Sequence, residues 1–321
     1  MCSRRIDPPA LSRPASILAP RPTQRAWRAP ATVVYAARTV PKAAPPIARS
    51  AWLRWGRAAL VAGGIAAAAW KKRALTRGGA AAAAVVGTVT FARGGLPAAV
   101  ALNAFFVSSS ALSRFKAREK ARRGVLAQAK GSERDAWQVL ANGGLATGCL
   151  GLFGTHGMGA FLGALAAAGA DTWATELGML AARPPRLLTT LRPVPPGTSG
   201  GVTPEGTLAA VAGAVTVGAA WMATAQLLGR GAAAPAVMRS ILAVGAAGTA
   251  GAMVDSVLGA TIQAAYWCPN CREPTETPLH RRCGQPTEQV RGWRWMDNDA
   301  VNALSTATGA LLSAWLWRVV H

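Results

Sequence analysis

Apolar runs separated by short polar and basic segments follow one another along most of this 321-residue chain. Several of them approach about 20 residues, the length that an α-helix needs to cross a bilayer. The runs cover residues 52–70, 79–92, 95–113, 138–154, 156–180, 203–228, 236–265 and 300–319. The pattern therefore predicts an all-α fold, a polytopic transmembrane bundle of about seven to eight helices over residues 51–321.

The second of these runs is short, and Arg93-Gly94-Gly95-Leu96-Pro97 separates it from the third. Glycine and proline interrupt helices, and a broken helix is tolerated at membrane depth only where neighbouring protein satisfies its backbone. The pair 79–92 and 95–113 is therefore predicted to form a hairpin that crosses only part of the membrane.

Composition agrees with a membrane domain. Hydrophobic residues make up 51% of the chain and charged residues 15%, and the apolar runs consist mainly of Ala, Gly, Val and Leu. Small side chains let helix backbones approach closely in lipid, where packing drives association. These features favour a polytopic membrane protein over a soluble two-domain one.

The formal charge of +22 lies largely in the segments between the apolar runs. By helix parity the basic segments 71–77, 113–134, 183–192 and 272–294 share one face, which the positive-inside rule assigns to the stroma or its equivalent. Membrane topology therefore accounts for the charge, and no nucleic-acid partner is expected. The sequence gives no indication of an oligomeric state.

Residues 1–50 are rich in Arg, Ser, Thr and Pro and contain one acid, Asp7. This composition is typical of a disordered organelle transit peptide, which would remove Cys2. Val34-Tyr35-Ala36-Ala37 resembles a plastid processing site, with cleavage after Ala36. A mitochondrial presequence and a plain disordered tail are the alternatives, but the proline content argues against the amphipathic helix of a mitochondrial signal. The expected location is a chloroplast membrane.

Carboxylates occur inside one apolar run, in GADTWATELG (169–178), which carries Asp171 and Glu176. An ionisable side chain at membrane depth costs about 2.5–3.5 kcal/mol, so such residues usually mark function. The other unusual polar stretches fall at the same predicted membrane face: 138–142, 192–206, 254–263 and 296–302. One shared site at that surface is the economical interpretation.

Helical geometry places Asp171, Thr172 and Glu176 on one polar face, and it groups Asp255 with Ser256 on another. Polar faces of this kind also hold membrane helices together. That alternative explains amides such as Asn298 and Asn302 well, but it explains carboxylates poorly.

The segment Gly197-Thr198-Ser199-Gly200-Gly201 runs into a predicted helix at Thr203. Glycines allow close backbone approach, and a helix N-terminus attracts anions, so phosphate binding is one interpretation and a flexible turn is the other. The carboxylates could hold Mg²⁺ against the same phosphates, which suits phosphoryl transfer. The candidate phosphate or nucleotide ligands are Arg192, Gly197, Thr198, Gly200, Gly201 and Thr203.

Four ordered motifs, GADTWATELG, LTTLRPVPPGTSGGVTPEGTLAA, DSVLGATIQ and DNDAVN, resemble the integral membrane family of transmembrane protein 19. The resemblance covers roughly residues 55–320 and implies, for plastid members, a kinase of the vitamin E pathway. Its substrates would be phytyl phosphate, an isoprenoid phosphate, and a nucleoside triphosphate, CTP or ATP; its product would serve tocopherol and phylloquinone synthesis.

The resulting candidate catalytic residues are Asp171, Thr172, Glu176, Asp255, Asp297, Asn298 and Asn302. The candidate Mg²⁺ ligands are Asp171, Glu176, Asp255 and Asp297. This chain has Asp299 where the family more usually has a second Asn. A transporter and a noncatalytic membrane protein of the same family are the alternative functions; the polar groups crowd one helix end rather than the midplane that transporters use.

The loop 266–294 contains Cys268-Pro-Asn-Cys271 and His280-Arg-Arg-Cys283. A Cys₃His set suits a structural, tetrahedral Zn²⁺ site, which would pin this loop between the last two helices. Three reduced thiols and a redox-switched disulfide are the alternatives.

Overall fold

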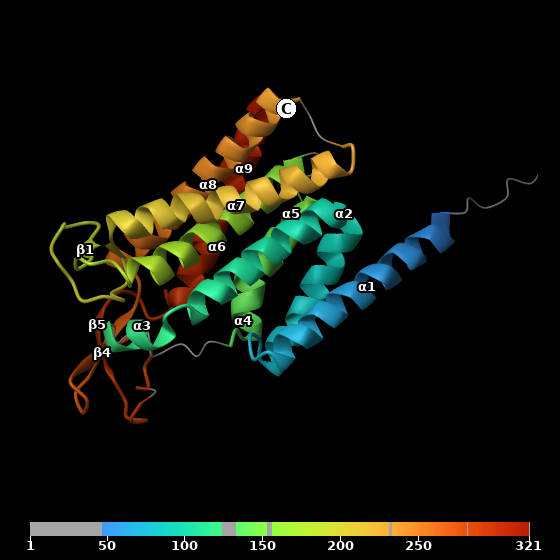
Figure 1. The fold of residues 1–321 in the computed structure, drawn as a ribbon. Helices are drawn as coiled ribbons and strands as arrows, with labels where there is room; N and C mark the ends of the chain where they lie inside the picture. The colour runs from blue at the N-terminus through green and yellow to red at the C-terminus, as the bar shows by residue number, and fades with distance from the viewer. Residues whose placement is uncertain (1–46, 124–132, 153–155, 231–232, 281, 321) are drawn as a thin grey trace, which may run out of the picture. The chain divides into compact units, whose positions relative to one another are not determined.

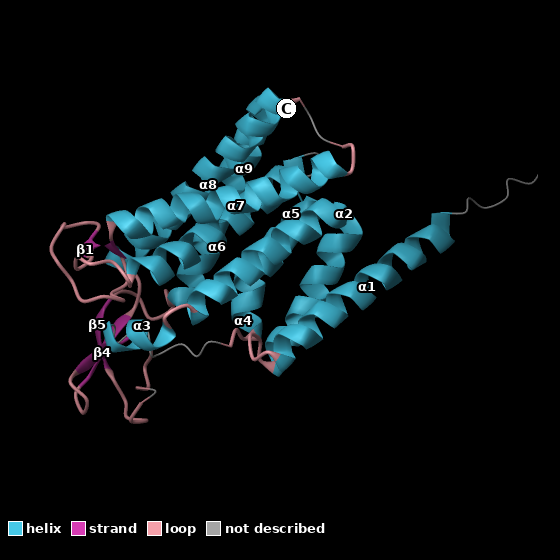
Figure 2. Ribbon diagram, in the orientation of Figure 1, coloured by secondary structure: helices cyan, strands magenta, loops and turns pink. Residues whose placement is uncertain are grey.

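The structure, a computed structural model, describes residues 47–123, 133–152, 156–230, 233–280 and 282–320. The predicted transit peptide falls outside these residues except for its last four, which open the first helix. Figure 2 shows a helical domain with two small patches of strand. The helices are α1 (Ile47–Lys71), α2 (Arg77–Arg114), α3 (Ala117–Arg123), α4 (Ala136–Val139), the π-helix η2 (Leu140–Gly144), α5 (Leu145–Leu152), α6 (Gly157–Gly178), α7 (Pro204–Leu227), α8 (Ala234–Thr261) and α9 (Asn298–Val320).

Helix α6 is the centre of the domain. Its residues from Gly157 to Ala170 are buried almost without interruption, and it packs against α2, α5, α7, α8 and α9. Glycines make this possible: a Cβ on Gly163 would overlap the backbone oxygen of Gly309 in α9. Close backbone contact of this kind is the expected way to pack helices in lipid. The central helix is therefore enclosed by protein and carries Asp171 and Glu176 at its less buried end.

Helix α2 corresponds to two predicted runs that meet at a kink. Gly95 has φ 69° and ψ −167°, outside the helical region, and Pro97 follows it. Proline and a glycine of positive φ are recognised causes of helix kinks. Figure 1 shows the two parts of α2 running in different directions from this point. The predicted break is present, as a kink within one long helical segment.

The run predicted at 138–154 is not one regular helix. It is divided into α4, the π-helical turn η2 and α5. The run predicted at 236–265 was also too long, because α8 ends at Thr261 and Ala265 begins a strand. Arg291 caps the end of α8 by donating to the carbonyl oxygens of Gly259 (2.7 Å) and Ala260 (3.1 Å).

Two small antiparallel sheets lie among the loops. Strands β1 (Arg186–Leu187) and β2 (Gly201–Val202) pair within the segment between α6 and α7. Strands β3 (Ala265–Cys268), β4 (Glu273–Thr275) and β5 (Glu288–Arg291) form a sheet of order β4-β3-β5 between α8 and α9. Figure 1 shows β1, β4, β5 and α3 gathered at one end of the helices.

Among the described residues, three helices, α2, α7 and α8, are long and apolar enough to cross a membrane. Large apolar side chains point outward from the helices, including Val107 of α2, Leu208 of α7, Leu242 of α8 and Leu311 of α9. Exposed apolar surface on this scale marks a membrane-contacting protein. The predicted all-α membrane fold is confirmed.

Candidate functional site

A polar cavity of about 480 Å³ lies where the C-terminal ends of α6 and α8 meet the N-terminal ends of α7 and α9. It contains residues from segments more than 100 positions apart in the chain. The cavity is lined by most of the predicted site residues: Asp171, Thr172, Glu176, Gly197, Thr198, Gly200, Gly201, Thr203, Asp255, Asn298 and Asn302. The structure therefore brings these carboxylates, amides and the glycine-rich loop to one place.

Two predicted residues lie outside this lining. Asp297 is exposed, and its Oδ1 accepts hydrogen bonds from the backbone N–H groups of Asp299 (3.0 Å) and Ala300 (2.9 Å), so it caps α9. Arg192 is exposed in the segment between α6 and α7, where its backbone oxygen accepts from Leu187 (2.9 Å). Neither residue contributes to the cavity in this arrangement.

Glu176 is engaged by protein partners. Ser113 donates to its Oε1 (2.6 Å), and the ammonium of Lys120 forms an ion pair with its Oε2. Lys120 is only 4% exposed, and a buried charge needs a partner of this kind. The pair ties α3 to α6 beside the polar cavity.

Arg134 lies at the edge of the same cavity, just before α4. Its backbone pairs with the segment between α1 and α2, donating to Ala74 and accepting from Thr76, both at 3.0 Å. Its guanidinium stands 5.4 Å from the ring centroid of Phe105. Burial lowers the pKa of Arg134, while the negative charges of Glu176 and Asp171 act in the opposite direction. A held, partly desolvated guanidinium is a strong ligand for phosphate oxygens.

The glycine-rich loop is fixed against α8. Gly200 has φ 81°, and a Cβ there would overlap the backbone of Ala260. A Cβ on Gly259 would in turn come within 2.8 Å of the Gly200 nitrogen. At the end of this loop, Thr203 caps α7 by accepting from Gly206 N (3.0 Å). The loop is therefore a docked wall of the cavity rather than a free turn.

Glu276, from the loop after β4, also lines the cavity. Ser199 Oγ donates to its Oε1 at 2.6 Å, and Gln263 Nε2 lies 3.5 Å from the same oxygen. Glu276 was not among the predicted residues, and neither were Lys120 and Arg134. Lys120 and Arg134 lie in the basic segment 113–134, whose charge membrane topology already explains. Glu276 lies in the cysteine loop 266–294, for which the sequence predicts zinc binding.

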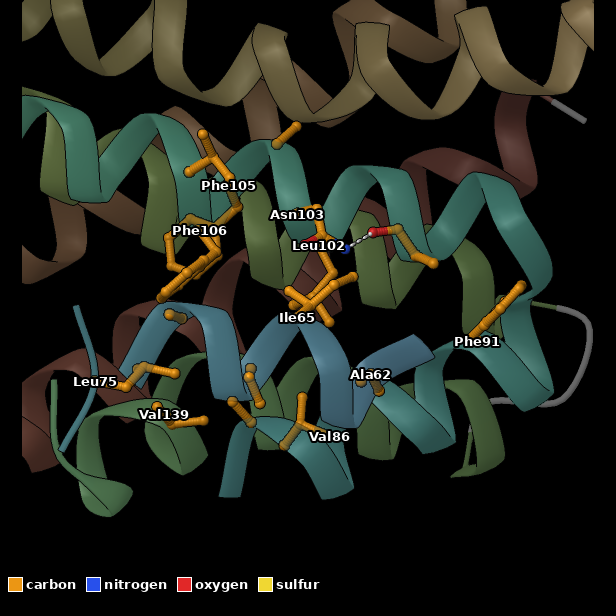
Figure 3. Close-up of a pocket in the computed structure, with 18 of the residues that line it drawn as sticks. Ala62, Ile65, Leu75, Val86, Phe91, Leu102, Asn103, Phe105, Phe106 and Val139 are labelled. Atoms are coloured by element: carbon orange, nitrogen blue, oxygen red, sulfur yellow. Dashed lines mark hydrogen bonds between the residues drawn. The ribbon is translucent and has the colours of Figure 1, made fainter. Parts of the chain in front are cut away.

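A second, apolar cavity of about 640 Å³ lies between α1, α2 and the α4–η2 segment. Figure 3 shows Ile65, Phe91, Leu102 and Phe106 around it, and the amide of Asn103 turned to its own helix, where it donates to Ala99 O (2.8 Å). The two cavities have three lining residues in common: Arg134, Gln138 and Asn142. Asn142 belongs to the π-helical turn η2, a feature that often marks functional positions.

The cysteine loop forms a separate cluster. Ligand atoms of Cys268, Cys271, His280 and Cys283 all lie within 4.8 Å of one another. A hydrogen bond from the backbone of Gln285, followed by one from His280, lowers the pKa of Cys283 to about 6. A hydrogen bond with Cys283 raises the pKa of Cys271 to about 11.

These features define an integral membrane protein with a polar site at one end of its helices. Residues 60–310 match the family described as integral membrane protein DUF92, and the chain belongs to this family. No solved structure matches the chain at a significant level.

The relatives include plant and cyanobacterial proteins. The chain is 33% identical to Protein PGR of Arabidopsis thaliana over 72% of this chain and 84% of that protein. It is 28% identical to an uncharacterised membrane protein of Synechocystis, over 71% of this chain and 77% of that protein. It is 24% identical to Protein VTE6, chloroplastic, of Arabidopsis thaliana, over 71% of this chain and 61% of that protein. Two of these relatives are plant proteins, and one of them is named as chloroplastic.

Proposed function

We propose that this protein is a membrane-embedded phosphotransferase that converts an isoprenoid phosphate, phytyl phosphate, to the diphosphate with a nucleoside triphosphate, CTP or ATP. In this reaction an oxygen of the isoprenoid phosphate attacks the terminal phosphorus of the nucleotide. A new P–O bond forms, the bond to the leaving oxygen breaks, and the nucleoside diphosphate departs.

The observation that carries the proposal is the junction of the two cavities at Arg134, Gln138 and Asn142. An isoprenoid phosphate has an apolar tail and an anionic head, and it needs both environments side by side. The apolar cavity, at about 640 Å³, lies in the usual size range of small-molecule pockets, about 300–1,000 Å³. With the tail there, Arg134 at the junction would bind the phosphate head.

Mg²⁺ fits part of the predicted ligand set. Asp171 and Asp255 line the polar cavity from α6 and α8, and Asn298 and Asn302 line it from α9. Carboxylates together with amide oxygens are donors that this ion accepts, and in phosphoryl transfer it neutralises phosphate charge. Glu176 instead binds Lys120 and Ser113, and Asp297 caps α9 outside the cavity lining. We assign metal binding to Asp171 and Asp255.

The remaining residues would position the reactants. The docked loop Gly197–Gly201 offers small residues that let the nucleotide phosphates approach its backbone. Arg134 would hold the attacking phosphate beside Asp171, and its fixed backbone limits movement during the reaction. The Lys120–Glu176 pair would keep α3 beside the cavity. Phosphoryl transfer depends chiefly on such positioning and charge neutralisation.

The relatives support a plastid role. The match to a protein called VTE6, chloroplastic, agrees with the predicted site in a chloroplast membrane. A lipid-borne substrate whose phosphate lies at the membrane surface also suits a polar cavity at one end of membrane helices.

The proposal is tested with the purified protein in detergent, given phytyl phosphate and either CTP or ATP labelled in the terminal phosphate. Transfer of label to phytyl diphosphate, from one nucleotide in preference to the other, is the expected result. Glu288→Gln should transfer label at the wild-type rate, because Glu288 is an exposed acid of β5 outside both cavities. It therefore serves as the control for carboxylate-to-amide changes inside the polar cavity. Binding of phytyl phosphate without diphosphate formation under any nucleotide would contradict the kinase and favour transport.

A further inference from the structure

Four metal-ligating side chains converge in the sheet between α8 and α9. Cys268 Sγ lies 3.6 Å from Cys283 Sγ, and His280 Nδ1 lies 3.2 Å from Cys283 Sγ. Four tetrahedral ligands at the usual zinc distances of about 2.3 Å for sulfur and about 2.0 Å for nitrogen stand roughly 3.5–3.8 Å apart. The observed separations are close to these values, and Cys268 and His280 are buried.

The backbone around the two pairs follows one pattern. After Cys268-Pro-Asn-Cys271, Arg272 has φ 53° and its N–H donates to Cys268 O (2.8 Å). After the second pair, Gly284 has φ 68° and its N–H donates to His280 O (2.7 Å). The N–H of Cys271 points at Cys268 Sγ (3.4 Å). Two matching turns, each with a left-handed residue directly after its last ligand, therefore face one another.

We propose that Cys268, Cys271, His280 and Cys283 bind one structural Zn²⁺ ion. The closed set of four protein ligands is typical of structural rather than catalytic zinc. The surroundings of His280 support the assignment. Its Nδ1 faces the cluster, its Nε2 lies 3.8 Å from Glu273 Oε2, and Arg282 holds that carboxylate at 3.0 Å. A carboxylate behind a ligating histidine fixes its ring and tautomer through a hydrogen bond, and Glu273 stands close to that position without making the bond.

The ion would stabilise the sheet that carries Glu276 to the polar cavity. Strands β3, β4 and β5 contain at most four residues each, so few ladder hydrogen bonds hold this sheet together. Zinc would join the β3–β4 turn to the segment before β5, on either side of Glu276. The segment 265–291 would therefore depend on the metal for its order, whereas α6 would not.

The first test measures metal in the full-length protein purified without added metal or chelator. We expect about one equivalent of zinc per chain in the wild type. The zinc content of Cys271→Ser should be lower by about tenfold or more. Cys149→Ala is the matched control: Cys149 lies in α5, far along the chain from the cluster, and this variant should keep its zinc. Metal-free wild-type protein, or equal zinc in the wild type and Cys271→Ser, would overturn the proposal.

A second test uses the wild-type chain alone, so it does not depend on the folding of a variant. Replacement of the metal by Co²⁺ should give thiolate charge-transfer bands and the visible spectrum of a tetrahedral site. Removal of the metal should raise hydrogen exchange in 265–291 and leave α6 unchanged. Mass mapping that finds a disulfide among Cys268, Cys271 and Cys283 in the metal-free native protein would instead establish the redox alternative. These readouts are independent of the phosphotransferase activity.

Discussion

The ammonium of Lys120 lies against the carboxylate of Glu176 and also donates to the backbone oxygens of Leu112 (2.7 Å) and Ser113 (3.2 Å). One buried lysine thus joins α3, the end of α2 and the central helix α6. The arrangement changes the role of Glu176, which the sequence presents as a metal ligand. In the structure Glu176 is the partner of Lys120, and its negative charge offsets the desolvation cost of burying the Lys120 ammonium.

We therefore predict that Lys120→Met and Glu176→Gln each destabilise the protein, by about 3 kcal/mol, because each leaves the other charge without its partner. The double variant should lose less than the sum of the two. The measurement is the thermal unfolding of the wild type, the two single variants and the double variant in the same detergent.

Diphosphate formation by folded Glu176→Gln separates the two roles. A positioning role predicts activity within about tenfold of wild type below the unfolding midpoint. If Glu176 is a metal ligand, the rate of diphosphate formation should fall about a hundredfold or more at every temperature, and that result would return Glu176 to the metal site.

The docking of the glycine-rich loop gives a second prediction. Gly200→Ala should lower stability and activity, since the new Cβ meets the backbone of Ala260 and the residue has φ 81°. Gly229→Ala is the matched control, because Gly229 has φ 66° with open space around it. Both variants carry backbone strain of about 1–2 kcal/mol, but only Gly200→Ala adds an overlap of about 1–3 kcal/mol. Equal effects in thermal unfolding would show that the loop is not docked as described.

The sequence predicted the helices well because lipid-spanning segments must be long, apolar and internally hydrogen-bonded. It also predicted that Asp171, Asp255 and Asn302 meet, since helix parity places their ends at one surface. The irregular features were harder to predict. A π-helical turn at Leu140–Gly144 depends on packing against neighbouring helices, and the apolar pattern of 138–154 does not reveal it.

The missed site residues have a common cause. Lys120 and Arg134 belong to a basic segment whose charge is already explained by topology, so nothing in the pattern singles them out. Their roles follow from tertiary contacts with Glu176 and Phe105. Asp297 belongs to the DNDAVN motif, but its position before α9 also makes it a good N-cap, which is the role that its hydrogen bonds indicate.

The apolar cavity predicts selectivity for long chains. Ile65 lines the cavity from α1, and Ile65→Trp should fill part of it without touching the polar site. We expect KM for phytyl phosphate to rise about tenfold or more, with little change for a five-carbon isoprenoid phosphate that does not reach this cavity. Steady-state kinetics with the two substrates measures the difference. An equal rise in KM for both substrates would show that the phytyl tail does not bind in this cavity.

The arrangement of loops predicts membrane sidedness. Thr190 and Glu288 lie in the two segments that meet near Ser199 and Glu276, whereas Arg230 follows α7 at its other end. A membrane-impermeant thiol reagent should label Thr190→Cys and Glu288→Cys from the same face and Arg230→Cys from the opposite one, above the background of the unmodified chain. Labelling of the first two from opposite faces would contradict a single polar cavity.

The central claim is that Asp171 takes part in phosphoryl transfer. Asp171→Asn keeps the size and hydrogen bonding of the side chain but removes the charge that a Mg²⁺ ligand needs. The direct measurement is the rate of phytyl diphosphate formation by this variant, compared with Glu288→Gln and with wild type at equal folded protein. The account predicts a loss of about a hundredfold or more for Asp171→Asn and none for the control. A rate within a fewfold of wild type would contradict it, because a carboxylate that only joins helices is replaced by an amide without loss of chemistry.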